Sequence, residues 1–593
     1  MRILAEKGQS TAPSARSTNH GMRQGRAAVA VMLLSAMLAA CGGGSGAKPA
    51  PEAGKVSGAV TYDFVPAVKS KGLDYAAARA LPVRGAVVEA FSATEILGST
   101  VTDAQGKYSL VLPPGREVKI RVQARLLRES KEGAWSVAIR DNTKPGYTAV
   151  PTNAPIYAME SKSLSVPQES MVLDLHAASG WTGSNAAGQY ASARAAAPFS
   201  VLDQAYGAMQ RFLAIAPDLN FPHLNIYWSE NNAPSEGEPK NGDIGTSHFN
   251  PEGPAPGLYI LGKADVDTDE YDTGVLVHEW GHYFEGRISR SDSVGGAHGE
   301  GDKLDMRVSW GEGWGNGLAG IVRNDPIYID TSGQKQQDSF SFDVSALPAP
   351  PNDAAWYNEA AMQYFIYQLA QQPGGFETTI SILRNEQKLT PAFTSIFPFG
   401  TALAKRLTDA TVIGKVNTLL TSVGTPTLNE LDDWGGPASY TIPTVPAEIA
   451  KPYVRFDAPA AGAPAATQQV CVSNMLGGEY NKLDQGRFLR LEVPSAGTYR
   501  LSATLVSPPA LVTKAHLWLS RQGVKIQEDD EAVEGALEAG TYTAFLVDTA
   551  LTNGDDDEDE DGSSAPAPGP TPVPANTRVC YQVSLERTSA GAL

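Results

Sequence analysis

The chain is 593 residues long, which at about 150 residues per domain predicts three or four domains. Hydrophobic residues make up 42% of it and charged residues 19%, a composition that excludes a coiled coil, a collagen or a wholly disordered chain. The formal net charge of −18 would repel a phosphate backbone, so nucleic acid is a poor partner, and only 3 cysteines exclude a disulfide-dense scaffold or a cysteine-rich metal cluster.

The N-terminal 41 residues have the pattern of an export signal. Arg23 and Arg26 precede an apolar run over residues 27–40, which is too short to span a bilayer but fits the apolar core of a secretory signal. The run ends in the string LAACG around Cys41, which resembles the lipobox of bacterial lipoprotein signals. That resemblance implies cleavage before Cys41 and lipidation of its thiol. We therefore expect a lipid-anchored protein of the bacterial cell envelope, with the outer membrane as its location.

Residues 55–175 follow a Gly-, Ser- and Pro-rich linker over residues 42–54 and alternate apolar and polar residues in short runs typical of strands. The string TDAQGKYSLVLPPG, residues 102–115, places Asp and Gly where a hairpin turn needs them. It resembles the carboxypeptidase-regulatory-like family, whose transthyretin-like sandwich accompanies secreted enzymes. We expect an all-β sandwich in this part of the chain.

Residues 176–446 change to a mixed pattern. Helical periodicity over residues 198–216 and 353–371 alternates with strand patterns over residues 224–228 and 257–264. This segment is expected to be an α+β domain.

Residues 447–593 return to strand patterns, and we expect strands over residues 488–493, 497–505, 516–520, 541–547 and 579–585. The string GRFLRLEVPSAGTYRLSATL resembles the bacterial pre-peptidase C-terminal domain, another β-sandwich that accompanies secreted peptidases. Because export permits disulfides, Cys471 and Cys580 are expected to be bonded and to join the first and last strands of this sandwich. The acidic and Pro-rich residues 553–576 are expected to form a solvated loop.

The string HEWGH, residues 278–282, lies in a stretch from Thr273 to Arg287 with a helical pattern. At 3.6 residues per turn, His278 and His282 share one helix face about 6 Å apart along the axis, so both imidazoles can bind one Zn²⁺. Glu279 flanks the same site and suits a general base that takes a proton from water activated by the metal. We expect one Zn²⁺ per chain.

Zinc needs a third protein ligand. A metzincin would have a His six residues after His282, where this chain has Ile288, so that class is excluded. Glu312 is the leading candidate, because it is a lone carboxylate in the apolar, glycine-rich residues 309–317 and a metal would neutralise it. Glycines lower the helix propensity of this segment. Their presence is explained if the segment is a helix that must lie very close to the HEWGH helix. The other candidate ligands are His298, Glu300, Asp302 and Asp305.

An HExxH string followed at a distance by a Glu resembles the gluzincin metallopeptidases, which implies a zincin-like catalytic domain that hydrolyses peptide bonds. In that family an acidic residue four positions after the ligand Glu orients the first His. This chain has Asn316 there, whose amide oxygen can accept the imidazole N–H. The downstream His of thermolysin-like members is missing, so the group that stabilises the oxyanion stays open between Tyr357, Tyr364, His298 and Arg307.

A second acidic pattern lies just before the HEWGH helix. Asp265, Asp267 and Asp269 imitate the start of an EF-hand loop, but Glu270 and Leu276 stand where Gly and Glu are needed. We interpret these residues as acids that precede a helix, and Ca²⁺ is only a secondary candidate cofactor.

These patterns together predict a multidomain protein in which an α+β zincin-like catalytic domain is flanked by two all-β sandwich domains. The predicted function is that of an exported zinc metallopeptidase, with a peptide or protein as substrate and a membrane contacted only through the lipid anchor. Two alternatives stay open. One is an HExxH hydrolase specific for glycosylated proteins or other amides, and the other is a non-catalytic surface adhesion or scaffold lipoprotein.

Overall fold

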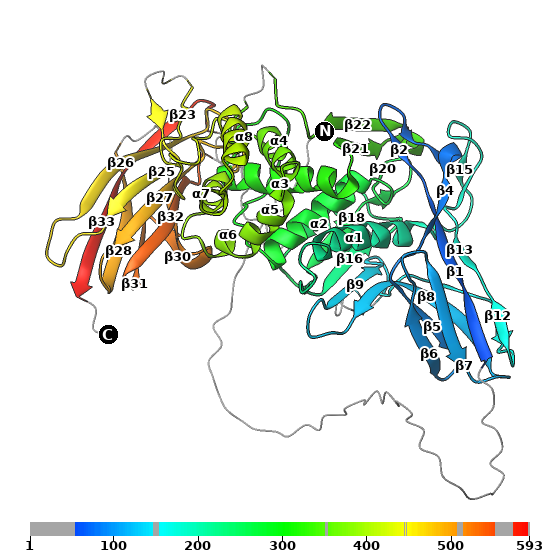
Figure 1. Ribbon diagram of the computed structural model, residues 1–593. Coiled ribbons are helices and arrows are strands. Elements are labelled where there is room, and N and C mark those ends of the chain that lie inside the picture. The colour runs from blue at the N-terminus through cyan, green and yellow to red at the C-terminus, as the bar shows by residue number, and fades with distance from the viewer. Residues whose placement is uncertain are drawn as a thin grey trace, which may run out of the picture.

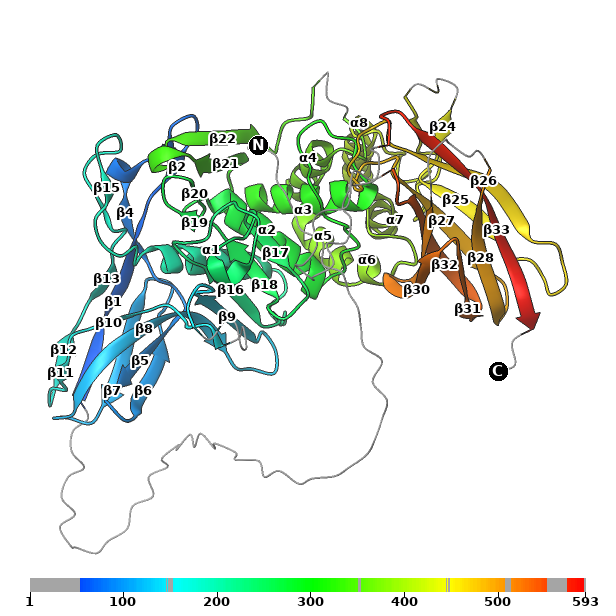
Figure 2. The ribbon, with the colours of Figure 1, turned by 180° about the vertical axis from the view of Figure 1, so that it is seen from behind.

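The computed structural model describes residues 54–145, 147, 153–349, 354–443, 445, 448–506, 514–551 and 573–590, with residues 589 and 590 described by their backbone alone. The export signal with Cys41, all but the end of the linker, and residues 553–572 of the acidic loop lie outside the described residues. The molecule is elongated, with strands at both ends and the helices between them (Figures 1 and 2). As predicted, it is a multidomain protein that combines many β-strands with fewer helices.

Two sheets form the N-terminal end. One is built on β1 (Gly54–Phe64), which pairs with β4 (Arg79–Pro82), β7 (Lys107–Leu112), β12 (Ser170–Val172) and β13 (Leu175–Ala177). The other contains β5 (Ala86–Phe91), β6 (Ile96–Val101), β8 (Glu117–Arg128), β9 (Trp135–Arg140), β10 (Ala158–Glu160) and β11 (Leu164–Ser165). Along β7 every second residue is buried, because alternate side chains of a strand point to opposite faces. The predicted all-β sandwich is therefore present.

The prediction of a hairpin at residues 102–115 is wrong, although the turn itself forms. The Asp103 carboxylate accepts hydrogen bonds from the backbone N–H groups of Gln105 and Lys107, and Gly106 adopts a φ of 73°. The flanking strands do not pair with each other, since β6 pairs with β5 and β7 pairs with β1. The turn instead connects the two sheets of the sandwich.

One sheet continues across the boundary predicted between residues 175 and 176. β9 pairs in parallel with β16 (Leu224–Trp228), β16 pairs with β18 (Gly257–Ile260), and β17 (His248–Asn250) lies at the edge. All five residues of β16 are buried, as is typical of a parallel strand covered on both faces. The predicted strand over residues 257–264 is interrupted after Ile260, and β19 (Gly262–Lys263) pairs with β20 (Asp267–Thr268) instead. The N-terminal sandwich and the central body therefore share a sheet and a hydrophobic core.

The central body carries the helices. They are α1 (Ala197–Leu213), α2 (Thr273–Arg287), α3 (Met306–Arg323), α4 (Glu359–Ala370), α5 (Gly375–Arg384), α6 (Glu386–Leu389), α7 (Ile396–Arg406) and α8 (Ala410–Ser422). α1 and α4 correspond to the two predicted helices, and α4 begins at Glu359 because Asn358 caps it through the N–H of Ala361, 3.1 Å away. β21 (Ile327–Ser332) and β22 (Asp338–Asp343) follow α3. Within the described residues, no helix is both long and apolar enough to cross a membrane.

The C-terminal end is a second sandwich. Its five-stranded sheet has the order β25 (Tyr453–Asp457), β27 (Gly486–Val493), β32 (Gly540–Asp548), β29 (Ala515–Arg521), β30 (Val524–Asp530). Its four-stranded sheet has the order β26 (Ala466–Ser473), β33 (Arg578–Ala590), β28 (Gly497–Leu505), β31 (Ala532–Leu537). The five predicted strands correspond to β27, β28, β29, β32 and β33. The predicted disulfide between Cys471 and Cys580 forms and reaches the last strand, β33, as expected. Its other end lies on β26 and not on the first strand of the sandwich, β25, and the two cysteines are directly opposite each other.

Short strands complete the fold and pair two by two: β2 (Ala67–Val68) with β3 (Gly72–Leu73), β14 (Trp181–Thr182) with β15 (Gln189–Tyr190), and β23 (Tyr440–Thr441) with β24 (Ile449–Ala450).

Candidate metal centre

The HEWGH string lies on α2, whose bounds are those predicted from the sequence. The helix is buried on nearly every side. Phe212 of α1 packs against Trp280 and Phe284 on one side of it, with ring centroids 5.0 and 4.5 Å apart. Because these aromatic contacts hold one face of α2 in the core, the two histidines are presented toward α3, on the opposite side.

Gly315 of α3 lets the two helices approach closely, as expected. Gly313 and Gly317 instead face α4, where their Cβ atoms would lie 2.3 Å from Cβ of Met362 and 2.9 Å from Cγ2 of Ile366. A Cβ on Gly281 would lie 3.3 Å from the Cα of Gly315, and a Cβ on Gly315 would lie 2.8 Å from Nδ1 of His278. The indole N–H of Trp314 also donates to the carbonyl of Gly281 over 3.0 Å. Larger residues at Gly281 and Gly315 would push the helices apart, so these two glycines are what bring the α3 carboxylate to the histidines.

His278, His282 and Glu312 converge, with one potential ligand atom of each within 4.8 Å of the others. The Nε2 atoms of the two histidines lie 2.9 Å apart, and Oε2 of Glu312 lies 3.2 Å from the first and 3.5 Å from the second. A tetrahedral Zn²⁺ with bonds of about 2.0–2.1 Å spaces its ligand atoms about 3.3 Å apart. Two imidazole nitrogens and one carboxylate oxygen therefore fit zinc in both spacing and chemical type.

Asn316 contacts the first histidine of the HEWGH string, as the sequence pattern predicts. Its Oδ1 is 2.8 Å from Nδ1 of His278. An amide oxygen can only accept, so the Nδ1–H of His278 donates to it, and Nε2 is the ring nitrogen that faces Glu312 and can bind a metal. This contact therefore keeps His278 in the tautomer that can bind a metal.

The electrostatics of the cluster are those of a carboxylate among imidazoles. Burial by itself would raise the pKa of Glu312, but the neighbouring His298 and His282 hold that pKa well below its usual value. Burial opposes a charge on His282, yet the Glu312 carboxylate raises the pKa of His282 to about 9. In the absence of a metal the cluster thus holds protons in the place of a cation.

His298 also faces the cluster. Its Nε2 lies 3.3 Å from Oε2 of Glu312, and its Nδ1 lies 2.6 Å from Oε2 of Glu359 at the start of α4. Burial opposes a charge on His298, but Glu312 and Glu359 together raise its pKa to about 10. The pairing with Glu359 directs the other ring nitrogen toward the site.

The C-terminal sandwich holds the loop that carries His298. Nδ2 of Asn481 donates to the carbonyls of Gly295 and Ala297, both over 3.0 Å, and Nζ of Lys482 donates to Ala297 over 2.9 Å. This second sandwich therefore contributes to the position of a side chain in the candidate site.

The remaining candidate ligands lie outside the cluster of three. Asp302 forms an ion pair with Lys482 over 3.1 Å, and Asp305 caps α3 by accepting the N–H of Arg307. Glu300 is exposed. Of the residues proposed from the sequence as third ligand, Glu312 alone joins both histidines within the described residues.

Arg307 and the two tyrosines were candidate oxyanion stabilisers, and the structure gives each another environment. The Arg307 guanidinium pairs with Asp305 and lies 4.3 Å from the ring centroid of Phe545 in the C-terminal sandwich. Tyr357 packs edge-on against Trp356, and Tyr364 is a partly buried residue of the hydrophobic core. His298, the fourth candidate, contacts the cluster through Glu312.

Three residues near the cluster were missed in the sequence. Glu359 pairs with His298. The sequence feature that could have indicated Glu359 is its position as an acid at the start of the helix that carries Tyr364. The ring of Tyr328 on β21 lies 6.2 Å from that of His278. Glu285, buried on α2 three residues after His282, has its pKa raised to about 7 by burial. Neither of the latter two belongs to a motif that marks it.

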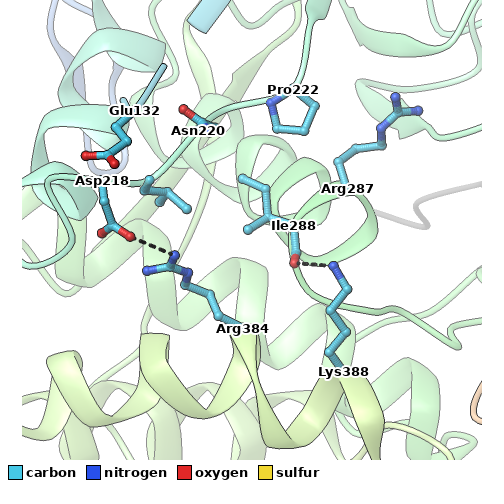
Figure 3. Close-up of a pocket in the computed structure, with 9 residues that line it drawn as sticks. Glu132, Asp218, Asn220, Pro222, Arg287, Ile288, Arg384 and Lys388 are labelled. Atoms are coloured by element: carbon cyan, nitrogen blue, oxygen red, sulfur yellow. Dashed lines mark hydrogen bonds and ion pairs between the residues drawn. The ribbon is translucent and has the colours of Figure 1, made fainter. Parts of the chain in front are cut away.

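A cavity of about 520 Å³ lies at the C-terminal end of α2 (Figure 3). Its lining includes Arg287 and Ile288, and two contacts cross it, from Arg384 to Asp218 over 3.7 Å and from Lys388 to the carbonyl of Ile288 over 3.1 Å. No member of the histidine–glutamate cluster lines it, so this cavity is distinct from the candidate metal centre.

Gly315→Ala is expected to weaken zinc binding by about tenfold or more, because the new methyl group would displace His278 and its contact with Asn316. It should also lower the free energy of unfolding by about 1–3 kcal/mol through overpacking. Gly414→Ala on exposed α8 is the matched control, since nothing lies within 4 Å of its Cβ, and it should stabilise the chain by up to about 1 kcal/mol. Denaturant unfolding and competition for zinc with a chelator measure both effects. Unchanged zinc affinity in Gly315→Ala would contradict the close contact.

No protein-family model and no curated protein matches the chain. Among solved structures, the pre-peptidase C-terminal domain of a collagenase from Bacillus anthracis is similar over 22% of this chain and 93% of its own, with 11% identity and a TM-score of 0.14. PliG, a periplasmic lysozyme inhibitor of g-type lysozyme from Aeromonas hydrophila, is similar over 22% of this chain and 95% of its own, with 12% identity and a TM-score of 0.13. Function is therefore inferred from the side chains of the site.

Proposed function

We propose that the protein is a zinc-dependent metallopeptidase in which His278, His282 and Glu312 hold Zn²⁺ and Glu279 is the general base. The observation that carries the proposal is the convergence of two imidazoles and one carboxylate from α2 and α3 within 4.8 Å. Oε1 of Glu279 lies 4.0 Å from Nε2 of His278, so the base flanks the metal position without entering the ligand set.

Each of these residues has a defined task in the proposed reaction. Zinc, when bound, polarises the scissile carbonyl and lowers the pKa of water. Glu279 accepts a proton from the attacking water and passes it to the leaving amine. His298, held by Glu359, donates a hydrogen bond to the carbonyl oxygen as negative charge develops there. Asn316 keeps His278 in the metal-binding tautomer.

The proposal extends to the family and the location. Two features support a gluzincin-type catalytic domain: the HExxH helix and the Glu on a second helix beside it. The lipobox around Cys41 supports a lipid-anchored protein of the bacterial cell envelope, facing the outside of the cell or the periplasm at the outer membrane. Two sandwiches of the carboxypeptidase-regulatory-like and pre-peptidase C-terminal types would then be the usual companions of a secreted enzyme.

The pairing of His298 with Glu359 supports turnover rather than a scaffold role. A scaffold has no use for a third imidazole held beside the metal position, whereas an enzyme needs a donor there. Hydrolysis of glycosylated proteins or other amides uses the same chemistry, so it is an outcome of the activity test.

Removal of the metal should abolish proteolysis. We expect the protein beginning at residue 42 to leave casein and mucin intact after its metal is removed by a chelator and dialysis. Addition of one equivalent of Zn²⁺ should restore cleavage. Product analysis by mass spectrometry decides between the substrates: cleavage of mucin alone favours the specificity for glycosylated proteins. A zinc-loaded chain that cleaves neither substrate would contradict the proposal.

A further inference from the structure

A second group of potential metal ligands lies just ahead of α2. Asp267 of β20, Asp269 two residues later and Asp330 of β21 each offer a carboxylate oxygen, and these oxygens lie within 4.8 Å of one another. Asp330 is about 60 residues further along the chain, and it is brought here because β20 pairs with β21 through Asp267 and Ser332. The sequence alone indicated only the first two of these acids.

The carboxylates of Asp267 and Asp269 are buried and that of Asp330 is partly buried, and no ion pair neutralises any of the three among the described residues. Asp267 and Asp269 are only 2% and 3% exposed, and Oδ1 of each is buried with no hydrogen-bond partner among the described residues. The other oxygen of Asp269 accepts from the Ser247 hydroxyl. Burying several carboxylates together is costly unless protons or a cation neutralise them.

The neighbouring Glu270 and Asp272 also keep one buried oxygen each without a partner in the described part of the chain, but they belong to other contacts and not to the group of three. Glu270 forms a buried ion pair with Arg194, and one oxygen of Asp272 accepts both the N–H and the hydroxyl of Thr331, over 2.7 and 2.8 Å. Without a cation, burial and the nearby Asp330 raise the pKa of Asp267 to about 8, and burial raises that of Asp330 to about 6. Protons then take the place of the missing positive charge.

We propose that Asp267, Asp269 and Asp330 bind one Ca²⁺, which ties β20 to β21 and fixes the segment that leads into α2. The donors are all oxygens, the preference of a hard cation. Three carboxylates from the protein suit Ca²⁺, whereas Mg²⁺ usually keeps several waters and takes one or two carboxylates. The site shares no residue with the zinc cluster, so it stands whether or not the protein is a peptidase. Its consequence is structural, because α2 begins at Thr273, four residues after Asp269.

Calcium titration of the zinc-loaded chain beginning at residue 42 tests this proposal. Calorimetry should find one tightly bound Ca²⁺ per chain, and the melting temperature should rise by about 5 °C at a hundredfold excess over the dissociation constant. MgCl₂ at the same concentration should have a clearly smaller effect. Zinc content, measured in parallel, should not change.

The Asp330→Asn variant tests whether Ca²⁺ binds at this site or elsewhere in the chain. The variant should bind Ca²⁺ at least about 100-fold more weakly, yet melt slightly higher than the wild-type chain in calcium-free buffer, because one repelling charge is gone. The matched control, Asp338→Asn in neighbouring β22, removes an exposed carboxylate and should leave both quantities unchanged. Asp267→Asn, with the same two expected results, serves if Asp330→Asn does not fold.

Two results would overturn the assignment. The first is a wild-type chain that binds no Ca²⁺ at millimolar concentration. The second is equal Ca²⁺ binding by wild type and Asp330→Asn, which would place the cation elsewhere, for example on the acidic run 555–561.

Discussion

Glu279→Gln is expected to lower kcat on casein by about 10³-fold or more while the chain keeps its Zn²⁺. Gln has the size of Glu but cannot accept the proton of the attacking water, so the base is removed and the ligands stay in place. The carboxylate lies 4.0 Å from Nε2 of His278 and is not one of the three converging ligands. Casein digestion with metal analysis of the same sample measures both quantities.

The control for this variant is Glu300→Gln. Glu300 lies on the loop that carries His298, but its side chain is exposed, and the change should leave most of the activity. Equal, nonzero activity in Glu279→Gln and the wild-type chain would remove Glu279 from the role of base.

Glu312→Ala is expected to weaken zinc binding by at least about 100-fold and to abolish hydrolysis. It removes the carboxylate oxygen that lies 3.2 and 3.5 Å from the two histidine nitrogens and leaves a site with two ligands on one helix. Zinc retained after dialysis against a competing chelator, measured by elemental analysis, gives the result.

The His298→Ala variant tests whether His298 is a zinc ligand or a hydrogen-bond donor to the oxyanion. If His298 stabilises the oxyanion, this variant should keep its zinc and lose about 10²-fold in kcat. If Glu312→Ala kept its zinc and His298→Ala lost it, the third ligand would be His298 and the assignment would be reversed.

Local patterns in the sequence predicted the elements that depend on near neighbours. The bounds of α2, the strand Leu224–Trp228 and five strands of the C-terminal sandwich follow from apolar periodicity, which is a property of consecutive residues. The turn at Asp103 was recognised for the same reason, but the partners of β6 and β7 were not, since turn chemistry does not specify which sheet a strand joins.

Contacts between distant segments decided the rest. The sheet that continues from β9 into β16 crosses the predicted boundary after residue 175, because strand pairing is set by the packing of the whole core. The packing of Arg307 against Phe545 is another contact between segments far apart in the sequence, and no local pattern predicts it. The pairing of His298 with Glu359 leaves no periodic trace in the sequence.

By itself, the sequence determined that two imidazoles share one face of a helix, because a spacing of four residues is nearly one helical turn. Only the tertiary structure decided which carboxylate meets them, since Glu312 reaches His278 through the close crossing of α2 and α3 at Gly281 and Gly315. The same holds for Asp330 beside Asp267: helix geometry is local, but the meeting of charges from separate segments depends on how the chain packs.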